Sequence, residues 1–569
     1  MEKYVIWVVI LQAILIGYAI KNGYFGKEKN IIEENKQTYR TGFHFQPPKN
    51  WMNGPMYYNG VYHFFYQYNP YGATWGNISW AHSVSYNLID WIHVDPALTP
   101  TELYDVGGCW SGSVTILPGD NVPVILYTGI SAGNEEVQNL AMPRDTSDPF
   151  LREWVKSRHN PLLTPGTDIH PRSFRDPTTA WQKKPDNTWA ILIGTQIDGY
   201  GAAILYKSRD FISWSRGDKP LHKSNGTGMW ECPDFYPVSS VGGGDGLDTS
   251  ANGADVRHVL KASFNACDYY IFGTYDSTTN EFSVVGVDFM DDRVQLRYDY
   301  GIFYGSKTFY DEAKKRRVLW AWVLEGDGEA EAGAVERGWY GLQALPRSVL
   351  LDEDKKQLIQ WPIEEVERLR DRKVTLENKE IESGGLLEIA GITASQADVE
   401  VSFRVPNLDG VELMDERWLD PRLLCSQNNA SVKGVFGPFG LLVLASEDLT
   451  EQTAIFFRIF KGREEHVVLM CSDQSRSSLK THVKEEIFGS FLRVDPNEEI
   501  SLRTLIDHSI VESFGGKGKS CITARVYPAL AISEKSHLYV FNNGAKSVRV
   551  SSLSAWSMKN ARFSQLLDL

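Results

Sequence analysis

Val61-Tyr62-His63-Phe64-Phe65-Tyr66 is a run of residues that are almost all β-branched or aromatic. Val124-Ile125-Leu126-Tyr127 and Ala190-Ile191-Leu192-Ile193 have the same character, and Gly, Pro, Asn and Asp residues lie between such runs. Short runs bounded by turn residues are typical of β-strands. They recur from about Phe43 to about Arg347 without helical periodicity, which favours a β-propeller of four-stranded blades over a β-sandwich of ordinary size.

A polar segment, Asp352–Lys356, follows this region. The charged stretch Ile363–Arg370 comes soon after it, and we predict a short helix there, within a connector between two domains. Beyond about Val374 alternating strands return with glycine-rich corners, and they predict a second all-β domain, a β-sandwich. The clearest of these strands are Val399–Val405, Ala454–Phe460 and Leu538–Phe541.

The length and composition agree with a globular protein of two domains. The chain has 569 residues, of which 12% are aromatic and 23% charged, and that length is too great for one ordinary domain. We therefore expect a propeller at residues 40–350, a linker at 351–373 and a sandwich at 374–569. The formal charge of -14 is spread along the chain. Because no Lys/Arg cluster offers a face for phosphates, nucleic acid is not expected as a partner.

The N-terminal residues 1–23 have the pattern of a secretory signal peptide or a signal anchor. Charged Met1-Glu2-Lys3 precedes an almost wholly apolar run, Tyr4–Ile20. The run is slightly short for a spanning helix, and Ala19 and Gly23 are small residues at which cleavage can occur. We favour cleavage and secretion. If the segment is instead retained, it is the one place where we expect the protein to meet a membrane.

Three Asn-x-Ser/Thr sequons, at Asn77, Asn225 and Asn429, become candidate glycosylation sites along a secretory route. The six cysteines include no C-x-x-C pair, which argues against a zinc site or a dense disulfide framework. One disulfide, Cys425 to Cys471, is a candidate. We expect the other four cysteines to be buried thiols.

Three segments of the first domain combine aromatic, amide and carboxylate residues where strands are expected to end. They are Trp51-Met52-Asn53-Gly54-Pro55, Phe174-Arg175-Asp176-Pro177 and Trp230-Glu231-Cys232-Pro233-Asp234. Aromatic faces stack on the apolar faces of sugar rings, while carboxylates, amides and arginine bind the hydroxyls. The segments therefore predict a carbohydrate-binding site.

The same segments resemble those of glycoside hydrolase family 32, which has W-M-N-D-P-N-G, R-D-P and E-C motifs in this order at similar spacings. Further matches to plant acid invertases extend over most of the chain: Trp75-Gly76-Asn77, Trp110-Ser111-Gly112-Ser113, Gly338–Gln343 and Asp507–Glu512. The resemblance implies a five-bladed β-propeller followed by a β-sandwich. It implies no metal and no organic cofactor.

Retaining cleavage of a fructofuranosyl bond needs two carboxyl groups close together, one acting as an acid and the other as a nucleophile. By resemblance Glu231 is the acid/base, and Pro233 beside it is the residue of the cell-wall branch of plant invertases. Asp176 resembles the stabiliser of the transition state, with Arg175 next to it. An ordinary Arg-Asp pair at a turn is the alternative reading.

Several other residues match positions of the family that contact sugar. Each tryptophan among them could instead be part of the propeller core. The candidates for substrate binding are Asn53, Gln67, Trp75, Trp110, Ser111 and Arg175.

The first motif is broken in this chain. It reads Trp51-Met52-Asn53-Gly54-Pro55, and the simplest alignment deletes Asp-Pro-Asn, including the nucleophile. In plant invertase genes a very small exon commonly encodes this tripeptide, so a skipped exon explains its loss between intact flanks. The alternative is a true deletion, which favours a catalytically inactive sugar-binding or regulatory protein, since loss of a nucleophile costs several orders of magnitude in rate.

A second departure lies at Lys261–Tyr270. Invertases that use sucrose usually have Asp-Asp-Thr-Lys within this segment, where this chain has Asn265-Ala266-Cys267. In the family that Asp and Lys hold the glucose half of sucrose. Their loss, with apolar Phe264 nearby, favours a leaving group whose hydroxyls are masked. Acylated sucrose is the candidate, and fructan is the other.

These observations predict a secreted β-fructofuranosidase that acts on sucrose or an acylated sucrose with retention. Water is the expected acceptor, although a sugar acceptor, and hence fructosyl transfer, stays open. The acidic sequence pI of about 5.4 argues against tight binding to the cell wall and favours a soluble protein of the apoplast. By analogy with the family, a proteinaceous invertase inhibitor is a candidate partner.

Overall fold

The structure is a computed structural model that describes residues 38–46, 54–72, 76–119, 121–183, 186–242, 244–289, 296–324, 339, 341–415, 417–463, 465–481, 483 and 485–565. Almost all of its regular structure is β-strand. The predicted all-β class is confirmed. The expected signal segment, residues 1–23, lies outside the described residues. In the part of the chain that the structure describes, no helix is both long enough and apolar enough to cross a membrane.

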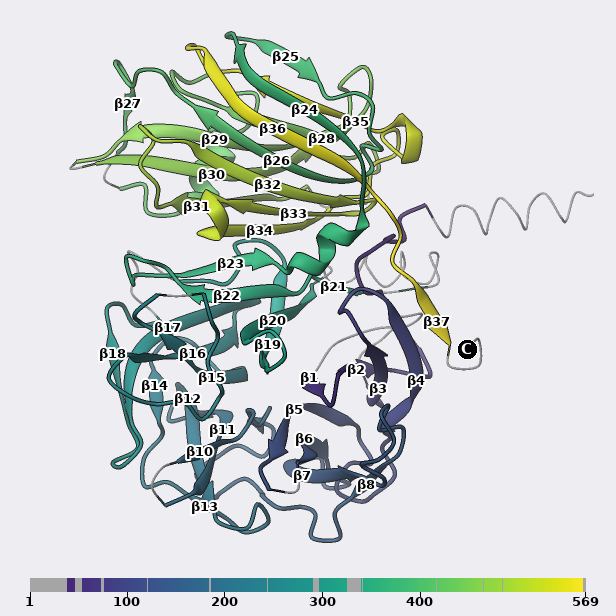
Figure 1. The fold of residues 1–569 in the computed structure, drawn as a ribbon. Helices are drawn as coiled ribbons and strands as arrows, with labels where there is room; N and C mark the ends of the chain where they lie inside the picture. Colours follow the sequence, from purple (N-terminus) through teal and green to yellow (C-terminus); the bar gives the residue numbers. More distant parts are fainter. Residues whose placement is uncertain are drawn as a thin grey trace, which may run out of the picture.

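Among the residues described up to Pro362, the strands form five sheets that follow one another around a circle in the lower half of Figure 1. The first contains β1 (Pro55–Tyr58), β2 (Val61–Tyr68), β3 (Ser79–Ser85) and β4 (Trp91–Leu98), and the second contains β5 (Cys109–Leu117), β6 (Val122–Ile130), β7 (Glu136–Pro143) and β8 (Trp154–Lys156). The third contains β9 (Phe174–Arg175), β10 (Trp181–Lys183), β11 (Thr188–Ile197), β12 (Tyr200–Ser208), β13 (Trp214–Arg216) and β14 (His222–Ser224).

The fourth sheet contains β15 (Glu231–Ser239), β16 (Val256–Phe264), β17 (Cys267–Asp276) and β18 (Glu281–Val285). The fifth contains β19 (Phe303–Asp311), β20 (Arg316–Val323), β21 (Leu342–Gln343), β22 (Arg347–Leu351) and β23 (Leu358–Pro362). Successive strands of the fourth sheet are antiparallel, so the start of β15 and the β16–β17 turn lie at the same end of the sheet.

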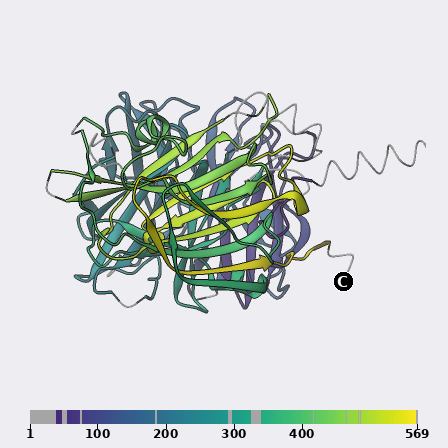
Figure 2. The same ribbon diagram turned by 90° about the horizontal axis from the view of Figure 1, so that it is seen from above.

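Two further sheets form the upper half of Figure 1, and their strands cross above the first five sheets in Figure 2. One contains β24 (Arg370–Ile381), β26 (Gln396–Arg404), β32 (Ile500–Asp507), β33 (Ile510–Gly515), β34 (Ser520–Arg525) and β36 (Val548–Met558). The other contains β25 (Gly385–Glu388), β27 (Glu412–Leu413), β28 (Phe439–Ala445), β29 (Gln452–Lys461), β30 (His466–Arg476), β31 (Ile487–Leu492) and β35 (His537–Asn542). The two sheets share one apolar core, so they pack as a sandwich.

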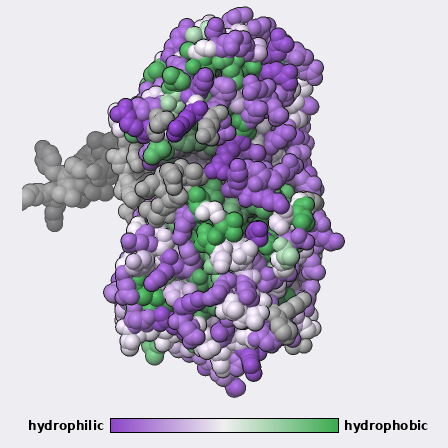
Figure 3. Space-filling view, turned by 90° about the vertical axis from the view of Figure 1, so that its left-hand side faces the viewer, coloured by the Kyte–Doolittle hydropathy of each residue, from purple (hydrophilic) through white to green (hydrophobic). Residues whose placement is uncertain are grey.

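Short helices connect some of these strands. They are η1 (Glu364–Leu369), α4 (Pro421–Gln427), η2 (Gly516–Gly518) and η3 (Ser533–Lys535). The helix expected at Ile363–Arg370 is present as η1. Outside the sandwich core, another core lies between sheets of the lower half, where Phe64 stacks on Trp320 with ring centroids 4.3 Å apart. Most of the face drawn in Figure 3 is polar, with apolar residues gathered in scattered patches.

Two expected domain limits are wrong. Residues 352–357, expected in the linker, form the turn of the β22–β23 hairpin, in which Leu351 pairs with Leu358. The polar residues there form a turn. Turns and linkers are both rich in polar residues, so composition does not distinguish them. The sandwich was expected to reach residue 569, yet β37 (Phe563–Gln565) pairs in parallel with β4 of the first sheet. In Figure 1 the chain therefore leaves the sandwich and returns to the lower half.

Cys425 and Cys471 form a disulfide, as expected from the sequence. It joins α4 to β30. Of the four free cysteines, Cys109, Cys232 and Cys521 are buried, in agreement with the expectation, but Cys267 is only half-buried. Cys267 directly follows a two-residue turn, and this position leaves one side of the residue uncovered.

Candidate active site

Arg175 lies between three carboxylates at the start of the third sheet. Its Nη2 donates to Glu231 Oε1 at 2.6 Å and its Nη1 donates to Glu136 Oε1 at 2.8 Å, while Nε is 4.0 Å from Asp176 Oδ2. Burial opposes the charged form of Arg175, but the three carboxylates outweigh it and raise the pKa of the guanidinium. Arg175 is therefore a permanent positive charge that binds the Glu231 carboxylate and lies next to that of Asp176.

The backbone at both carboxylates is unusual. Asp176 has φ 67° and Cys232, next to Glu231, has φ 44°, so two non-glycine residues adopt the left-handed conformation. The Cys232 N–H donates to Asp176 Oδ2 at 2.7 Å, and the Asp176 N–H donates to Thr128 Oγ1 at 2.8 Å. These bonds fix Asp176, which is buried, against the segment that carries Glu231. Strained conformations of this kind are concentrated at functional sites.

Tyr304 is a residue of the site that sequence reasoning missed. Its hydroxyl donates to Glu231 Oε2, so the two oxygens of that carboxylate are bound by Arg175 and Tyr304. Burial and the adjacent Glu231 carboxylate raise the pKa of Tyr304, and its proton therefore stays on the phenol. Tyr304 lies in β19, more than seventy residues beyond Glu231, and it is not part of any motif that we recognised.

Glu136 is a second missed residue. It is buried in β7, where Oε1 accepts from Arg175 and Oε2 accepts from the Phe174 N–H at 2.7 Å. Burial raises the pKa of Glu136 although Arg175 acts in the opposite direction. Its place in an ordinary buried strand gave no sequence signal.

The predicted aromatic and polar residues lie beside this cluster. The guanidinium of Arg175 is 5.9 Å from the centre of the Trp110 ring, which is a cation–π contact. Gln67 Nε2 donates to Ser111 Oγ at 2.9 Å, so the first and second sheets meet here. The structure thus brings Arg175, Asp176, Glu231 and Trp110 together. Gln67 joins them through its hydrogen bond to Ser111, the residue after Trp110.

Two predicted contacts, Asn53 and Trp75, lie outside the described residues, as does the position from which Asp-Pro-Asn is missing. Of the candidate glycosylation sites, Asn77 and Asn225 are exposed and Asn429 is half-buried. Among the residues that the structure describes, no group of three or more His, Cys, Asp or Glu side chains could hold a metal ion.

The second departure from the family pattern lies beside Glu231. Glu231 is opposite Ser263 across the β15–β16 pair, and Asn265-Ala266 forms the tight turn that follows two residues later. Asn265 has φ 49° and Ala266 has φ 55°, as a two-residue hairpin turn requires. Phe264 packs on Tyr269 with ring centroids 4.3 Å apart. The short turn next to Glu231 therefore has no charged residue of its own, although Nη1 of Arg297 lies 3.5 Å from Cys267 Sγ.

Comparison with known proteins decides the family. The model of the glycosyl hydrolases family 32 N-terminal domain matches residues 44–362, and that of the family 32 C-terminal region matches residues 365–557. The chain belongs to glycoside hydrolase family 32. The fold is accordingly the β-propeller with a β-sandwich of that family, and the protein is a glycoside hydrolase.

Relatives of this family 32 hydrolase are found among plant cell-wall enzymes, and the expected resemblance to that branch is confirmed. It is 54% identical over 542 residues to the insoluble β-fructofuranosidase isoenzyme CWINV1 of Arabidopsis thaliana, covering 93% of this chain and 92% of that protein. It is 53% identical over 541 residues to a fructan 6-exohydrolase of Beta vulgaris, covering 93% of this chain and 88% of the relative. The crystal structure of fructan 1-exohydrolase IIa from Cichorium intybus is 54% identical and superposes with a TM-score of 0.90, covering 93% of this chain and 99% of that one.

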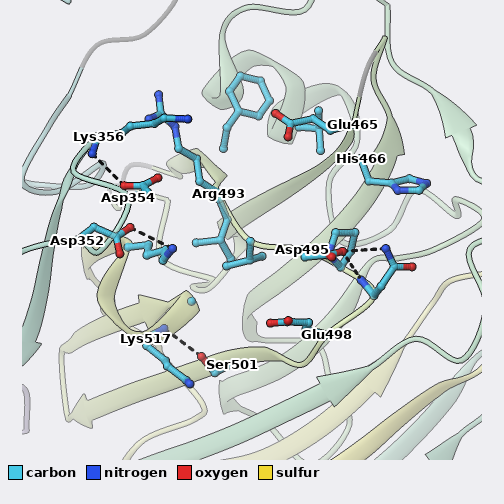
Figure 4. A pocket seen from close by; sticks show the side chains of 18 of the residues that line it. Asp352, Asp354, Lys356, Glu465, His466, Arg493, Asp495, Glu498, Ser501 and Lys517 are labelled. Atoms are coloured by element: carbon cyan, nitrogen blue, oxygen red, sulfur yellow. Dashed lines mark hydrogen bonds and ion pairs between the residues drawn. The ribbon is translucent and has the colours of Figure 1, made fainter. Parts of the chain in front are cut away.

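The family 32 chain also has a groove of about 1210 Å³ between the β22–β23 hairpin and the edge of the sandwich. None of the predicted site residues lines it. Figure 4 shows acidic side chains such as Asp354 and Glu498 together with basic ones such as Arg493 and Lys517 around this groove. The groove is thus a feature separate from the Arg175 cluster.

Proposed function

We propose that the chain is a secreted β-fructofuranosidase that cleaves the terminal fructosyl bond of sucrose or an acylated sucrose with retention. The observation that carries the proposal is the Arg175 cluster, in which one guanidinium is bound to Glu231, adjoins Asp176 and makes a cation–π contact with Trp110. Relatives that cover more than nine-tenths of the chain bear the names of β-fructofuranosidases and fructan exohydrolases, which supports fructosyl hydrolysis.

In this proposal Glu231 is the acid/base. It protonates the leaving oxygen and later takes a proton from water, while Asp176 stabilises the positive charge that develops on the fructose ring. Arg175 and Tyr304 hold the Glu231 carboxyl in place, and Trp110 offers a face for the sugar. Gln67, Ser111, Asn53 and Trp75 are proposed as further contacts of the fructosyl group.

We propose that the five sheets of the first domain are the five blades of the propeller. The propeller then ends at Pro362 and receives β37 as an added edge strand. Secretion is proposed from the apolar segment near the N-terminus and from the exposed sequons at Asn77 and Asn225. Names of relatives as insoluble or cell-wall isoenzymes agree with an extracellular location.

The missing nucleophile defines the alternative function. If the chain truly lacks Asp-Pro-Asn between Asn53 and Gly54, it retains an acid and a stabiliser but no attacking group, and it is a sugar-binding or regulatory protein. We propose instead that the natural transcript encodes the tripeptide. The intact contacts of Arg175 with Glu231 and of Cys232 N–H with Asp176 support this, since they keep the proposed acid and the proposed stabiliser side by side.

The proposed leaving group follows from the Asn265-Ala266 turn. In this proposal a sugar that binds beside Glu231 meets the exposed Ala266 and the half-buried Cys267 in place of the Asp and Lys of the family pattern, while Phe264 is buried beneath the turn. Free glucose hydroxyls then lose the partners that this Asp and Lys would supply. An acylated glucosyl group has fewer hydroxyls to satisfy and more apolar surface to bury. Acylsucrose is therefore proposed as a better substrate than sucrose, with fructan as the competing substrate.

The test begins with the transcript across codons 50 to 60. Its exact product and a product with Asp-Pro-Asn restored are expressed, each with a Glu231→Gln control, and fructose release is followed from sucrose, acylsucrose and a fructan. Release chiefly from acylsucrose that disappears in the Glu231→Gln control supports the proposal. A transcript without the tripeptide whose product binds sugar but releases no fructose would establish the binding protein.

A further inference from the structure

Two strand irregularities meet at the candidate acid/base. The β15–β16 register shifts between Glu231 and Asp234, and the β19–β20 register shifts between Tyr304 and Lys307. One irregularity begins at Glu231 itself. The other begins at Tyr304, whose hydroxyl donates to Glu231. Irregularities of this kind re-aim side chains, and they hold their shape only when their freed backbone groups find other partners.

Lys261 supplies partners to both irregular segments. It lies in β16, is fully buried, and its Nζ donates to the carbonyl oxygen of Cys232 at 3.1 Å and to that of Ser306 at 2.9 Å. Cys232 follows Glu231 directly, and Ser306 lies two residues after Tyr304. One ammonium group therefore ties the backbone next to the acid/base to the backbone next to its hydrogen-bond partner.

Asp268 completes this arrangement from β17. Its Oδ1 accepts from the Gly305 N–H at 3.1 Å and its Oδ2 accepts from the Ser306 N–H at 2.7 Å. Oδ2 is also 3.2 Å from Lys261 Nζ, and the Ser263 hydroxyl, which accepts from Lys261 at 2.6 Å, donates to Oδ1 at 2.6 Å. Asp268 is fully buried, so each of these bonds lies away from water.

A buried ion pair is by itself weak evidence for a role, because apolar residues often replace such a pair without loss of stability. Here, however, all the remaining partners of Lys261 and Asp268 except the Ser263 hydroxyl are backbone groups of the two irregular segments. An apolar pair would leave the Gly305 and Ser306 N–H groups without acceptors. This is the pattern expected of a positioning device.

We propose that Lys261 and Asp268 are positioning residues that hold the Tyr304 hydroxyl on the Glu231 carboxylate. They contact neither oxygen of Glu231 and act through the backbone of β15 and β19. The inference rests on the proposed function for its catalytic meaning, but the placement itself is a property of the folded chain. A consequence is that Tyr304 shields the Glu231 carboxylate through this hydrogen bond only while Asp268 is intact.

A double-mutant cycle tests this consequence without any need for turnover. Tyr304→Phe, Asp268→Asn and the combined variant are compared with the parent chain by the rate at which a water-soluble carbodiimide with glycine ethyl ester modifies Glu231 at one fixed pH. Peptide mass spectrometry measures this rate. The direct charge effect of Asp268→Asn is the same with Tyr or Phe at position 304. It therefore cancels when the effect of Tyr304→Phe in the parent chain is compared with its effect in the Asp268→Asn background.

Loss of the Tyr304 hydrogen bond frees Oε2 of the Glu231 carboxylate for reaction. Tyr304→Phe is therefore expected to raise the rate of Glu231 modification by about tenfold in the parent chain. In the Asp268→Asn background the same change is expected to raise it by less than about twofold. Equal rate increases in the two backgrounds would overturn the proposal.

Asp311→Asn is the matched control. Asp311 is a fully buried carboxylate of the same strand as Tyr304, and it is paired with Arg316 at 2.9 Å. Its variant is expected to lower stability and to leave the Tyr304 effect intact. If it abolished the effect as Asp268→Asn does, general loosening of β19 would explain both results and the proposal would fail. Should Asp268→Asn not fold, Ser263→Ala removes the bridging hydroxyl and replaces it in the cycle.

The pH dependence of kcat/KM separates this inference from the proposed function. If the parent chain releases fructose, its profile is expected to show the same coupling between Tyr304 and Asp268. Coupling in the labelling experiment without fructose release from any form would support positioning and reject the hydrolase. Fructose release, together with an equal effect of Tyr304→Phe on labelling in both Asp268 backgrounds, would support the hydrolase and reject the positioning role.

Discussion

Arg175 Nη2 lies 2.6 Å from Glu231 Oε1, although the two residues begin different sheets and are separated by more than fifty positions. The same guanidinium binds the buried Glu136 at 2.8 Å. Since Arg175 keeps its charge at every physiological pH, the position of Glu231 does not depend on the state of any titrating neighbour on this side. The other side is bound by Tyr304, which keeps its proton.

Arg175→Lys is expected to lower kcat/KM for fructose release by about 100-fold in the form of the enzyme that is active. Lysine has one nitrogen where arginine offers a planar fork, so it cannot bind Glu136 and Glu231 together. The measurement is steady-state kinetics against pH. Arg172→Lys, three positions earlier and exposed, is the control and should leave the rate unchanged. Equal rates for both variants would contradict the bridging role.

His44 is expected to make the contact between the two domains sensitive to alkali. Its Nδ1 is 2.9 Å from Asp507 and its Nε2 is 3.0 Å from Glu512, and all three side chains are fully buried. Burial lowers the pKa of His44, but the bonds and charges of the two carboxylates outweigh it and raise the pKa above the ordinary 6.5. The stabilisation is then complete below pH 6.5 and is lost as the pH rises through the raised value.

The carboxylates set the acid limit of this contact. The pKa of Glu512 is lowered to about 2, by Arg347 and His44 against the effect of burial, so its contribution is present above the ordinary 4.5 and is lost as the pH falls. The contribution of this contact, measured by urea denaturation as the difference in the free energy of unfolding between the parent and His44→Gln, should therefore be largest between about pH 4.5 and 6.5. His44→Gln should flatten the alkaline side of the parent's profile of stability against pH, and an unchanged slope would refute the assignment.

His63 and His82 are expected to have the opposite dependence on pH. They are stacked in the first sheet with Nδ1 of His63 3.0 Å from Nε2 of His82. Burial lowers the pKa of His63 to about 3 and also lowers that of His82. The unfolded chain takes up these protons from pH 6.5 downward while the folded chain does not, so stability falls as the pH falls.

For His63 alone this loss is on the order of 3 kcal/mol at pH 4 relative to pH 7. Replacing both histidines by glutamine should reduce the difference in the free energy of unfolding between these two pH values. His159→Gln, at an exposed position, provides the control. A double variant as acid-sensitive as the parent would show that these histidines are not the cause.

The Cys425–Cys471 disulfide is expected to stabilise the sandwich by about 4 kcal/mol, because it closes a loop with a sequence separation of 46 residues. The double variant Cys425→Ala/Cys471→Ala should lose this amount in urea denaturation. Cys109→Ala removes a buried thiol of the propeller and is the control for loss of side-chain volume. If the disulfide variant lost no more than the control, the cross-link would contribute nothing measurable.

The sequence by itself determined the all-β class, the order of propeller and sandwich, and the positions of Arg175, Asp176 and Glu231. These follow from local patterns, since strands and turns are specified by neighbouring residues and the motifs are short and contiguous. The sequence alone also showed the break at Asn53-Gly54 and the loss of the charged turn near Asn265, because both are departures from a linear pattern.

Only the tertiary structure decided which distant residues complete the site. Glu136, Tyr304, Lys261 and Asp268 belong to ordinary buried strands, and their roles depend on strand irregularities and on contacts between sheets that no local pattern encodes. The same is true of β37, whose return to β4 depends on an unpaired sheet edge more than four hundred residues away. Contacts over such separations are settled by packing and by the need of buried polar groups for partners, and those conditions exist only once the chain is folded.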